Sequence, residues 1–240
     1  MTKTILAPGL LCDETVWQPV LDRLGTSATV ADFSHQDNLT AMAQNALALS
    51  TGPLNVAGHS MGARVAMEMA RIAPERVEKL ALLDSGIHPL RDGEIEKREE
   101  IVRFAYENGI AALAERWLPG MVYKPNQMNE DLMGKLTDMV LRKTPHVHAR
   151  QIKALVDRPN AAAYLSQIEC PVLLIVGRQD QWSPVSQHEA MKDLLPNARL
   201  EIIEDAGHFA PVERPEKVTD FIEAFFDKVL GDDLKLASGC

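Results

Sequence analysis

A serine between two glycines is the strongest chemical signal in the sequence. Residues 58–62 read Gly-His-Ser-Met-Gly, follow an apolar run over 54–57 and precede a helical pattern over 61–73. A serine in this strand–turn–helix context is held on a tight turn with its hydroxyl exposed, because a Cβ at either glycine would clash with the neighbouring strand or helix. The helix N-terminus also favours negative charge beside it. The pattern therefore predicts Ser60 as a nucleophile at a nucleophile elbow, rather than a simple helix cap.

A serine hydroxyl needs a base that removes its proton. Of the seven histidines, His208 is the best candidate, because it lies in a loop between the last predicted strand and the last predicted helix. His59 adjoins Ser60, but its side chain should point away from the tight turn. His146 and His148 are two positions apart on a predicted helix, so they make poor joint metal ligands. We expect every histidine except His208 to be structural or exposed.

The base in turn needs a carboxylate that orients it and stabilises its positive form. Asp180 follows the predicted strand over 172–176, which places it at the same edge of the sheet as Ser60. Asp84, just after the strand over 77–83, and Asp205, close to His208 in sequence, are alternatives. A turn or cap role would also explain an aspartate at these positions. Asp180 is the preferred candidate.

A tetrahedral intermediate requires two N–H donors around its oxyanion. Met61 follows the nucleophile, and Leu10 lies in the turn after the first strand, so their backbone N–H groups are the candidates. An insertion that covers the pocket should determine the substrate. Ordinary core packing explains the candidate pocket residues equally well, but together they indicate a mostly apolar acyl pocket of modest size. These residues are Leu11, Trp17, Trp117, Met121, Trp182 and Phe209.

Strands and helices alternate along the chain. Apolar runs predict strands over 4–7, 28–33, 54–57, 77–83, 172–176 and 200–203, and helical spacing predicts helices over 38–49, 61–73, 184–195 and 215–230. This order predicts an α/β fold with a mostly parallel central sheet and helices on both faces. Helical patterns over 95–106, 110–117, 132–141 and 147–156 predict a helical lid over 89–166, inserted into a core of 1–88 and 167–240.

Composition excludes several classes of protein. The 240 residues include 34 acidic and 25 basic side chains, a net charge of −9, which disfavours a nucleic-acid surface. The chain has no apolar run of membrane-spanning length and no signal-peptide pattern. The cysteines Cys12, Cys170 and Cys240 form neither a disulfide framework nor a metal motif, so we expect a cytoplasmic protein. We expect a monomer or a homodimer, with no membrane partner.

The order Ser60, Asp180, His208 in its strand–elbow–helix context resembles the α/β-hydrolase superfamily over nearly the whole chain. Residues 177–184 and 207–218 resemble the acid and histidine loops of small esterases, lactonases and carbon–carbon bond hydrolases. In three places the sequence departs from the family pattern. Pro8-Gly9 replaces the usual His-Gly, Ala63 replaces a common third glycine, and the chain begins almost at the first strand, so the usual leading hairpin should be shortened or absent.

The resemblance implies a serine hydrolase with a Ser-His-Asp catalytic triad, an acyl-enzyme intermediate and no metal or organic cofactor. Our first interpretation is a carboxylesterase that cleaves a small-molecule ester with a small to medium acyl group. The alternatives are an enol-lactonase or a carbon–carbon bond hydrolase of aromatic degradation. A non-catalytic ligand-binding relative that keeps the triad is the alternative from another class. A haloalkane dehalogenase is disfavoured, because that chemistry uses an aspartate where Ser60 stands.

Overall fold

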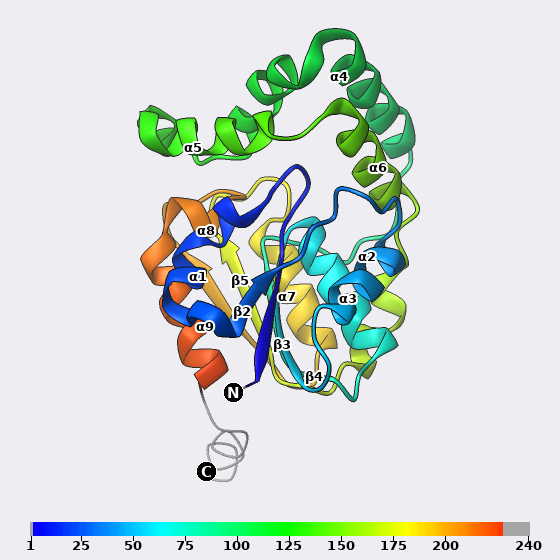
Figure 1. Ribbon diagram of the computed structural model, residues 1–240, viewed down its shortest axis with the longest axis vertical. Coiled ribbons are helices and arrows are strands. Elements are labelled where there is room, and N and C mark those ends of the chain that lie inside the picture. Colours follow the sequence, from blue (N-terminus) through cyan, green and yellow to red (C-terminus); the bar gives the residue numbers. More distant parts are fainter. Residues whose placement is uncertain (1, 228–240) are drawn as a thin grey trace.

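The chain folds around a single parallel sheet (Figure 1). The computed structural model describes residues 2–227, and within them the sheet has six strands in the order β2-β1-β3-β4-β5-β6. Every neighbouring pair is parallel. The strands are β1 (Lys3–Ala7), β2 (Ala28–Val30), β3 (Leu54–His59), β4 (Val77–Leu83), β5 (Val172–Gly177) and β6 (Ala198–Ile203).

Side chains of the strands alternate between two apolar layers, as period-two geometry requires. Ile5 packs into one layer and Leu6 into the other. The first layer is covered by α2 (Leu39–Ala48), α3 (Met61–Ile72) and α7 (Val185–Leu194), and the second by α1 (Gln18–Leu24) and α9 (Pro215–Asp227). Both faces of the central strands are therefore buried, which explains the apolar sequence of strands such as β5 and confirms the predicted α/β architecture.

Three helices between β4 and β5 lie over the carboxyl ends of the strands, drawn in green at the top of Figure 1. We call residues 89–166 the lid. It contains α4 (Glu94–Trp117), α5 (Glu130–Leu141) and α6 (Pro145–Val156). The helices predicted over 95–106 and 110–117 are the two halves of α4, which kinks at Gly109, where φ is 84°. Glycine adopts this left-handed backbone without steric cost.

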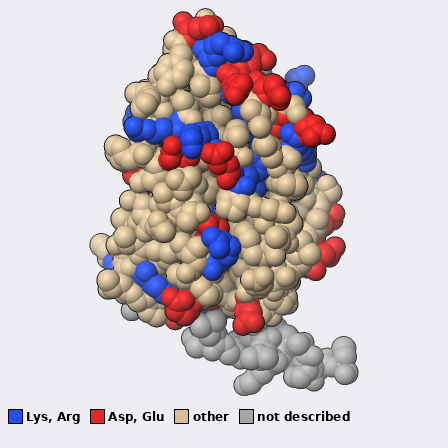
Figure 2. Space-filling model, turned by 90° about the vertical axis from the view of Figure 1, so that its right-hand side faces the viewer, with Lys and Arg blue, Asp and Glu red and all other residues tan. Residues whose placement is uncertain are grey.

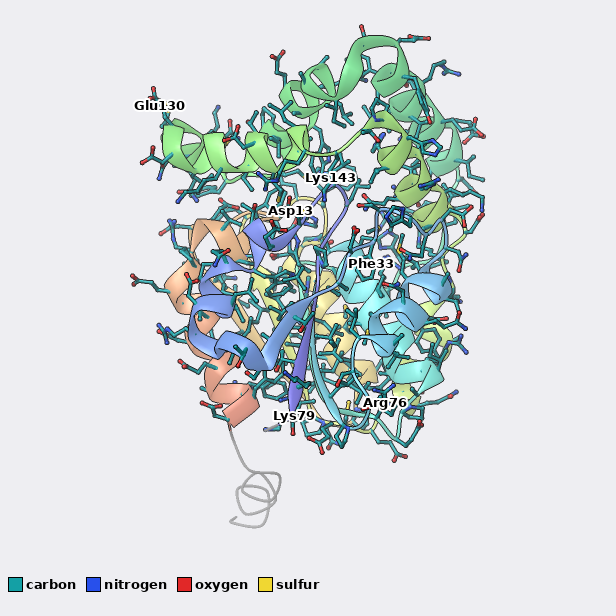
Figure 3. The ribbon with its side chains drawn as sticks, viewed as in Figure 1. Asp13, Phe33, Arg76, Lys79, Glu130 and Lys143 are labelled. Atoms are coloured by element: carbon teal, nitrogen blue, oxygen red, sulfur yellow. The ribbon has the colours of Figure 1, made fainter. Side chains whose placement is uncertain are left out.

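The lid is tied to the core by charged side chains from the start of the loop between α5 and α6. The guanidinium of Arg142 donates to both carboxylate oxygens of Asp13, at 2.9 and 3.0 Å. The ammonium of Lys143 lies 3.9 Å from the same carboxylate, and Figure 3 shows Lys143 above Asp13. The largely buried carboxylate of Asp13, in the core, thus attracts two cationic side chains of the lid.

Some predicted boundaries are wrong. The second strand ends at Val30 rather than Phe33, because Ala31 and Phe33 bury their side chains in the core after the backbone has left the edge of the sheet. Helix α1 and the short helix α8 (Ala210–Glu213) were not predicted. Residues 228–230 of the last predicted helix, and Cys240, lie outside the described residues.

No helix within residues 2–227 has both the length and the apolar character needed to cross a bilayer.

Short 3-10 helices complete the described secondary structure. They lie in the connections between the longer elements. They are η1 (Glu14–Val16), η2 (Gly25–Ser27), η3 (Leu118–Gly120), η4 (Lys124–Met128), η5 (Ala161–Ala163) and η6 (Leu165–Gln167).

Candidate active site

Ser60 occupies a strained turn between β3 and α3. Its φ of 56° and ψ of −115° lie in a region that residues with a side chain rarely adopt. A Cβ on Gly62 would collide with the carbonyl of Ala7 in the neighbouring strand, and a Cβ on Gly58 would lie 2.6 Å from the Cα of Ala63. The two glycines are therefore required for the close approach that the sequence pattern predicted.

Residues with a strained backbone lie at one edge of the sheet. The residues other than glycine with positive φ in the described chain are Leu11, Ser60, Asp84 and Asp205. Each of them lies just beyond the carboxyl end of a strand, after β1, β3, β4 and β6 respectively. Strained backbone often marks a functional site, because the surrounding structure must hold the residue in place. This edge of the sheet is the one that the lid covers.

Three residues predicted from separate parts of the sequence meet at this edge. The Nε2 atom of His208 lies 2.8 Å from the Ser60 hydroxyl oxygen, and its Nδ1 atom lies 2.8 Å from a carboxylate oxygen of Asp180. Since a carboxylate only accepts, Nδ1 carries the proton and Nε2 is free to accept from the serine O–H. The chain thus contains a connected serine–imidazole–carboxylate arrangement of the kind that activates a hydroxyl.

Asp180 is held as a charged hydrogen-bond acceptor. Its second carboxylate oxygen accepts from the backbone N–H groups of Trp182, at 2.8 Å, and Ser183, at 3.0 Å. Burial by itself would raise the pKa of Asp180, but the charge and hydrogen bond of His208 and these two N–H groups lower it below its ordinary value. The carboxylate therefore stays ionised beside the imidazole, as the orientation of a base requires.

The two alternative carboxylates, Asp84 and Asp205, form hydrogen bonds or ion pairs with groups other than the imidazole of His208. Asp84 is fully buried and accepts from the backbone N–H groups of Gly177, at 2.9 Å, and Ala210, at 3.2 Å. Burial, followed by the charge of Asp180, raises its pKa well above its ordinary value. Asp84 thus links the loop that carries Asp180 to the loop that carries His208. The side chain of Asp205 is 63% exposed and faces Arg214.

His59 turns away from the hydroxyl of its neighbour, as predicted. Its Nε2 atom donates to the backbone carbonyl of His208 at 2.7 Å. Burial lowers the pKa of His59 to about 3, so the ring is neutral at physiological pH. His188 is also buried, and its Nε2 atom accepts from the backbone N–H of Ser85 at 3.1 Å. These histidines stabilise the loops around the site.

The predicted oxyanion donors lie next to Ser60. Leu10 and Met61 both line the cavity into which Ser60 opens, and their backbone N–H groups have no hydrogen-bond partner within residues 2–227. A Cβ on Gly9 would lie 3.2 Å from the Cβ of Ser60, so the loop after β1 passes close to the nucleophile. The N–H of Leu11 donates instead to the side chain of Gln151 in the lid, at 2.8 Å.

The cavity has a volume of about 680 Å³ and lies between the sheet edge and the lid. Four of the six predicted pocket residues line it, and the predictions for Trp17 and Phe209 are wrong. Trp17 is fully buried in the core, and Phe209 packs behind the imidazoles of His59 and His208, with ring centroids 5.5 and 6.3 Å away. The four that line the cavity are Leu11, Trp117, Met121 and Trp182.

Charged residues of the cavity were missed by the sequence analysis, which predicted a mostly apolar pocket. Six basic and four acidic side chains line the cavity, most of them from α4 and the loop before it. Figure 2 shows basic and acidic side chains gathered over the lid half of the molecule. Arg64 could have been noticed, since it interrupts a largely apolar helix one turn after Ser60.

A buried histidine of the lid also lines the cavity. His148 lines the cavity, is 2% exposed, and its Nδ1 atom has no hydrogen-bond partner in the described chain. Burial, followed by the charge of Arg98, lowers its pKa to about 4. No three His, Cys, Asp or Glu side chains within residues 2–227 are grouped as metal ligands would be.

The chain is similar to known proteins in both sequence and structure. The family model for the alpha/beta hydrolase fold matches residues 25–215. A putative 2-succinyl-6-hydroxy-2,4-cyclohexadiene-1-carboxylate synthase of Bacillus subtilis is 28% identical over 225 residues, which cover 87% of this chain and 80% of that protein. A 2-hydroxy-6-oxononadienedioate/2-hydroxy-6-oxononatrienedioate hydrolase of a Pseudomonas species is 27% identical over 70% of this chain and 61% of that protein, which is less than two thirds of its length.

Among solved structures, a thermophilic esterase from Thermogutta terrifontis with malate bound is similar over most of both chains. The TM-score is 0.87 and the sequences are 27% identical, with 94% of this chain and 89% of that chain covered. The similarity includes the core and the lid, because the covered share leaves only a small part of this chain unmatched.

Proposed function

Because the chain belongs to the α/β-hydrolase family, we propose that it is a serine carboxylesterase that cleaves small to medium acyl esters with Ser60, His208 and Asp180. The observation that carries this proposal is the continuous chain of 2.8 Å contacts from the Ser60 hydroxyl through His208 to Asp180. The similarity to the esterase from Thermogutta terrifontis supports the same class of substrate.

The proposed reaction is acyl transfer to water in two steps. Nε2 of His208 accepts the Ser60 proton while the serine oxygen attacks the ester carbonyl carbon. The N–H groups of Leu10 and Met61 donate to the oxyanion of the tetrahedral intermediate. His208 then returns the proton to the leaving alcohol, and water attacks the acyl-enzyme with the same imidazole as base. Asp180 keeps its charge throughout and stabilises the imidazolium.

A carbon–carbon bond hydrolase is the second candidate. By their names, the Pseudomonas relative hydrolyses a dioate and the Bacillus subtilis relative makes a carboxylate, so both handle compounds that carry carboxyl groups. The basic side chains around the cavity of this chain favour a similar substrate. An enol-lactone is hydrolysed by the same acyl-enzyme chemistry and remains the third substrate class to compare.

A substrate panel tests the proposal. We expect 4-nitrophenyl acetate, butyrate and hexanoate to be hydrolysed with a pre-steady-state burst, and Ser60→Ala to reduce kcat by about 10⁴–10⁶. A fluorophosphonate should add to Ser60, as measured by peptide mass. Ser166→Ala, which removes an exposed serine far along the chain, is the matched control.

The outcomes separate the candidates. Faster turnover of a ring-cleavage diketone or an enol-lactone than of any nitrophenyl ester would replace the carboxylesterase by the corresponding alternative. The absence of any burst, turnover or fluorophosphonate adduct would contradict a hydrolase and favour the ligand-binding relative. Activity that survives in Ser60→Ala would contradict the assignment of the nucleophile.

A further inference from the structure

Arg64 is a buried cation that has no carboxylate partner in the described part of the chain. The residue is 8% exposed, and the one hydrogen bond that its side chain forms within residues 2–227 runs from a terminal nitrogen to the carbonyl of His88, at 3.4 Å. A buried charge that lacks an opposite charge destabilises the folded state. An arginine at such a position needs an explanation beyond packing.

Neighbouring cations increase the positive charge on this wall of the cavity. Arg158 donates to the same carbonyl of His88, at 3.3 Å. Arg158 also forms two hydrogen bonds with Glu94, at 2.7 and 2.8 Å, and Arg98 donates to Glu94 at 2.8 Å. One carboxylate therefore faces two guanidinium groups, and Arg64 adds a third. This local excess of positive charge contrasts with the net charge of −9 of the whole chain.

The position of Arg64 relates it directly to the nucleophile. Its backbone N–H lies 3.4 Å from the carbonyl of Ser60, so the two residues are one helical turn apart at the start of α3. Side chains on a helix lean toward its N-terminus, which for Arg64 is the end that carries Ser60. Arg64 and Ser60 line the same cavity, and the buried imidazole of His148 lines it as well.

We propose that Arg64 binds a carboxylate of the substrate, so that the preferred substrates are carbonyl compounds with an anionic group a few atoms from the scissile bond. This inference rests on the proposed hydrolase function and deepens it. A guanidinium presents a planar fork of N–H donors that matches the two oxygens of a carboxylate. A bound carboxylate would supply the opposite charge that this position lacks, and Arg158 and Arg98 would strengthen its attraction.

A binding measurement tests the carboxylate site without catalysis. In a Ser60→Ala background, adipate should raise the Tm in a concentration-dependent manner, and neutral adipamide should not. Adding Arg64→Met should abolish the adipate effect. Adding Arg103→Met removes one exposed positive charge of α4 that does not line the cavity, and should preserve the effect.

A pair of matched esters tests the same residue in the reaction. The mono-4-nitrophenyl ester of adipic acid and 4-nitrophenyl hexanoate differ only by a carboxylate in place of a terminal methyl group. We expect the ratio of their kcat/KM values to fall on the order of 10²-fold in Arg64→Met, the usual effect of truncating one partner of a buried charge pair. Arg64→Lys should recover part of the ratio, and Arg103→Met should not change it.

The stability of the unliganded variant separates a ligand-binding role from a structural one. Arg64→Met should raise the Tm, because it removes an unpaired buried charge and keeps apolar volume. A lower Tm together with an unchanged ester ratio would overturn the proposal, while hydrolysis of the hexanoate ester would leave the proposed function intact. Adipate binding that depends on Arg64, in a protein that hydrolyses no ester, would support the carboxylate site and contradict the proposed function.

Discussion

The side-chain oxygen of Gln151 accepts a hydrogen bond from the backbone N–H of Leu11 at 2.8 Å, and so joins the lid helix α6 to the loop after β1. The amide nitrogen of Gln151 donates to the carbonyl of Phe33 at 3.3 Å, in the loop after β2. Leu11 has a φ of 59°, a strained conformation that this bond helps to hold. Because Leu10 is the proposed oxyanion donor, the lid supports the catalytic loop as well as covering the cavity.

Gln151→Leu should therefore impair catalysis more than binding. The N–H of Leu11 loses its partner while it remains buried, which should lower the free energy of unfolding by about 1–3 kcal/mol. We expect kcat to fall by about 10- to 100-fold, with a smaller change in KM, because the oxyanion loop is less well held. Steady-state kinetics and urea unfolding measure the two effects.

Gln127→Leu is the control for the loss of a lid amide. Gln127 donates to the carbonyls of Pro119 and Val122, both in the lid itself. Its removal should leave kcat nearly unchanged. A Gln151→Leu enzyme with normal kcat would show that the lid does not position the oxyanion loop.

Asp180→Asn should reduce kcat by about 10³–10⁴, because a neutral amide no longer favours the required tautomer or stabilises the imidazolium of His208. Asp84→Asn should reduce kcat by less than about tenfold and destabilise the fold by about 1–3 kcal/mol, because one of its two N–H partners, Gly177 or Ala210, loses an acceptor. Kinetics and unfolding of both variants under one set of conditions provide the test. A larger loss of kcat in Asp84→Asn than in Asp180→Asn would show that Asp84, and not Asp180, is the carboxylate that supports His208.

Gly62→Ala should destabilise the protein by about 1–3 kcal/mol, because its Cβ would collide with the backbone carbonyl of Ala7 and force α3 away from β1. Gly134→Ala provides a control of opposite sign. Gly134 lies on the exposed side of α5 with open space around it, so alanine there should stabilise the helix by roughly 0.5–1 kcal/mol. Thermal unfolding measures the stability of both variants. Equal changes in Tm for Gly62→Ala and Gly134→Ala would contradict the close contact between Gly62 and the carbonyl of Ala7.

Glu94→Gln should reveal a pH-dependent contribution to stability. Burial by itself would raise the pKa of Glu94, but hydrogen bonds from Arg158 and Arg98 lower it to about 2. A carboxyl with a depressed folded-state pKa stabilises the fold above its ordinary pKa, and this contribution is lost as pH falls toward about 2. At pH 7 we expect Glu94→Gln to lower the free energy of unfolding by roughly 1–2 kcal/mol, because partial exposure screens the pair.

Urea unfolding at pH 7, 4 and 2.5 measures this dependence. The difference between the wild type and Glu94→Gln should shrink as the pH falls. Glu96→Gln changes an exposed glutamate of the same helix and should show no such trend. A difference that is constant over this range would mean that the charge of Glu94 does not stabilise the lid.

Local sequence was sufficient to predict the turn around Ser60 and the order of the elements. The elbow around Ser60 depends on two glycines within five residues, and the strands are recognised by short apolar runs buried on both faces. These signals are local because the steric clash at a tight turn and the periodicity of a strand or helix involve only neighbouring residues. For the same reason, the alternation of elements predicted a parallel sheet with a helical insertion.

Only the tertiary structure decided which side chains meet across the sheet edge. Asp84 and Asp180 follow neighbouring strands, so the sequence preferred Asp180 but kept Asp84 as an alternative. The direction of each loop brings Asp180 to the imidazole of His208 and Asp84 to two backbone N–H groups. Trp17 lies in the core rather than in the predicted pocket, and Arg64 lines the cavity although arginine side chains are usually exposed. These outcomes depend on contacts between segments that are far apart in the chain, and no local pattern records which partner a buried group will find.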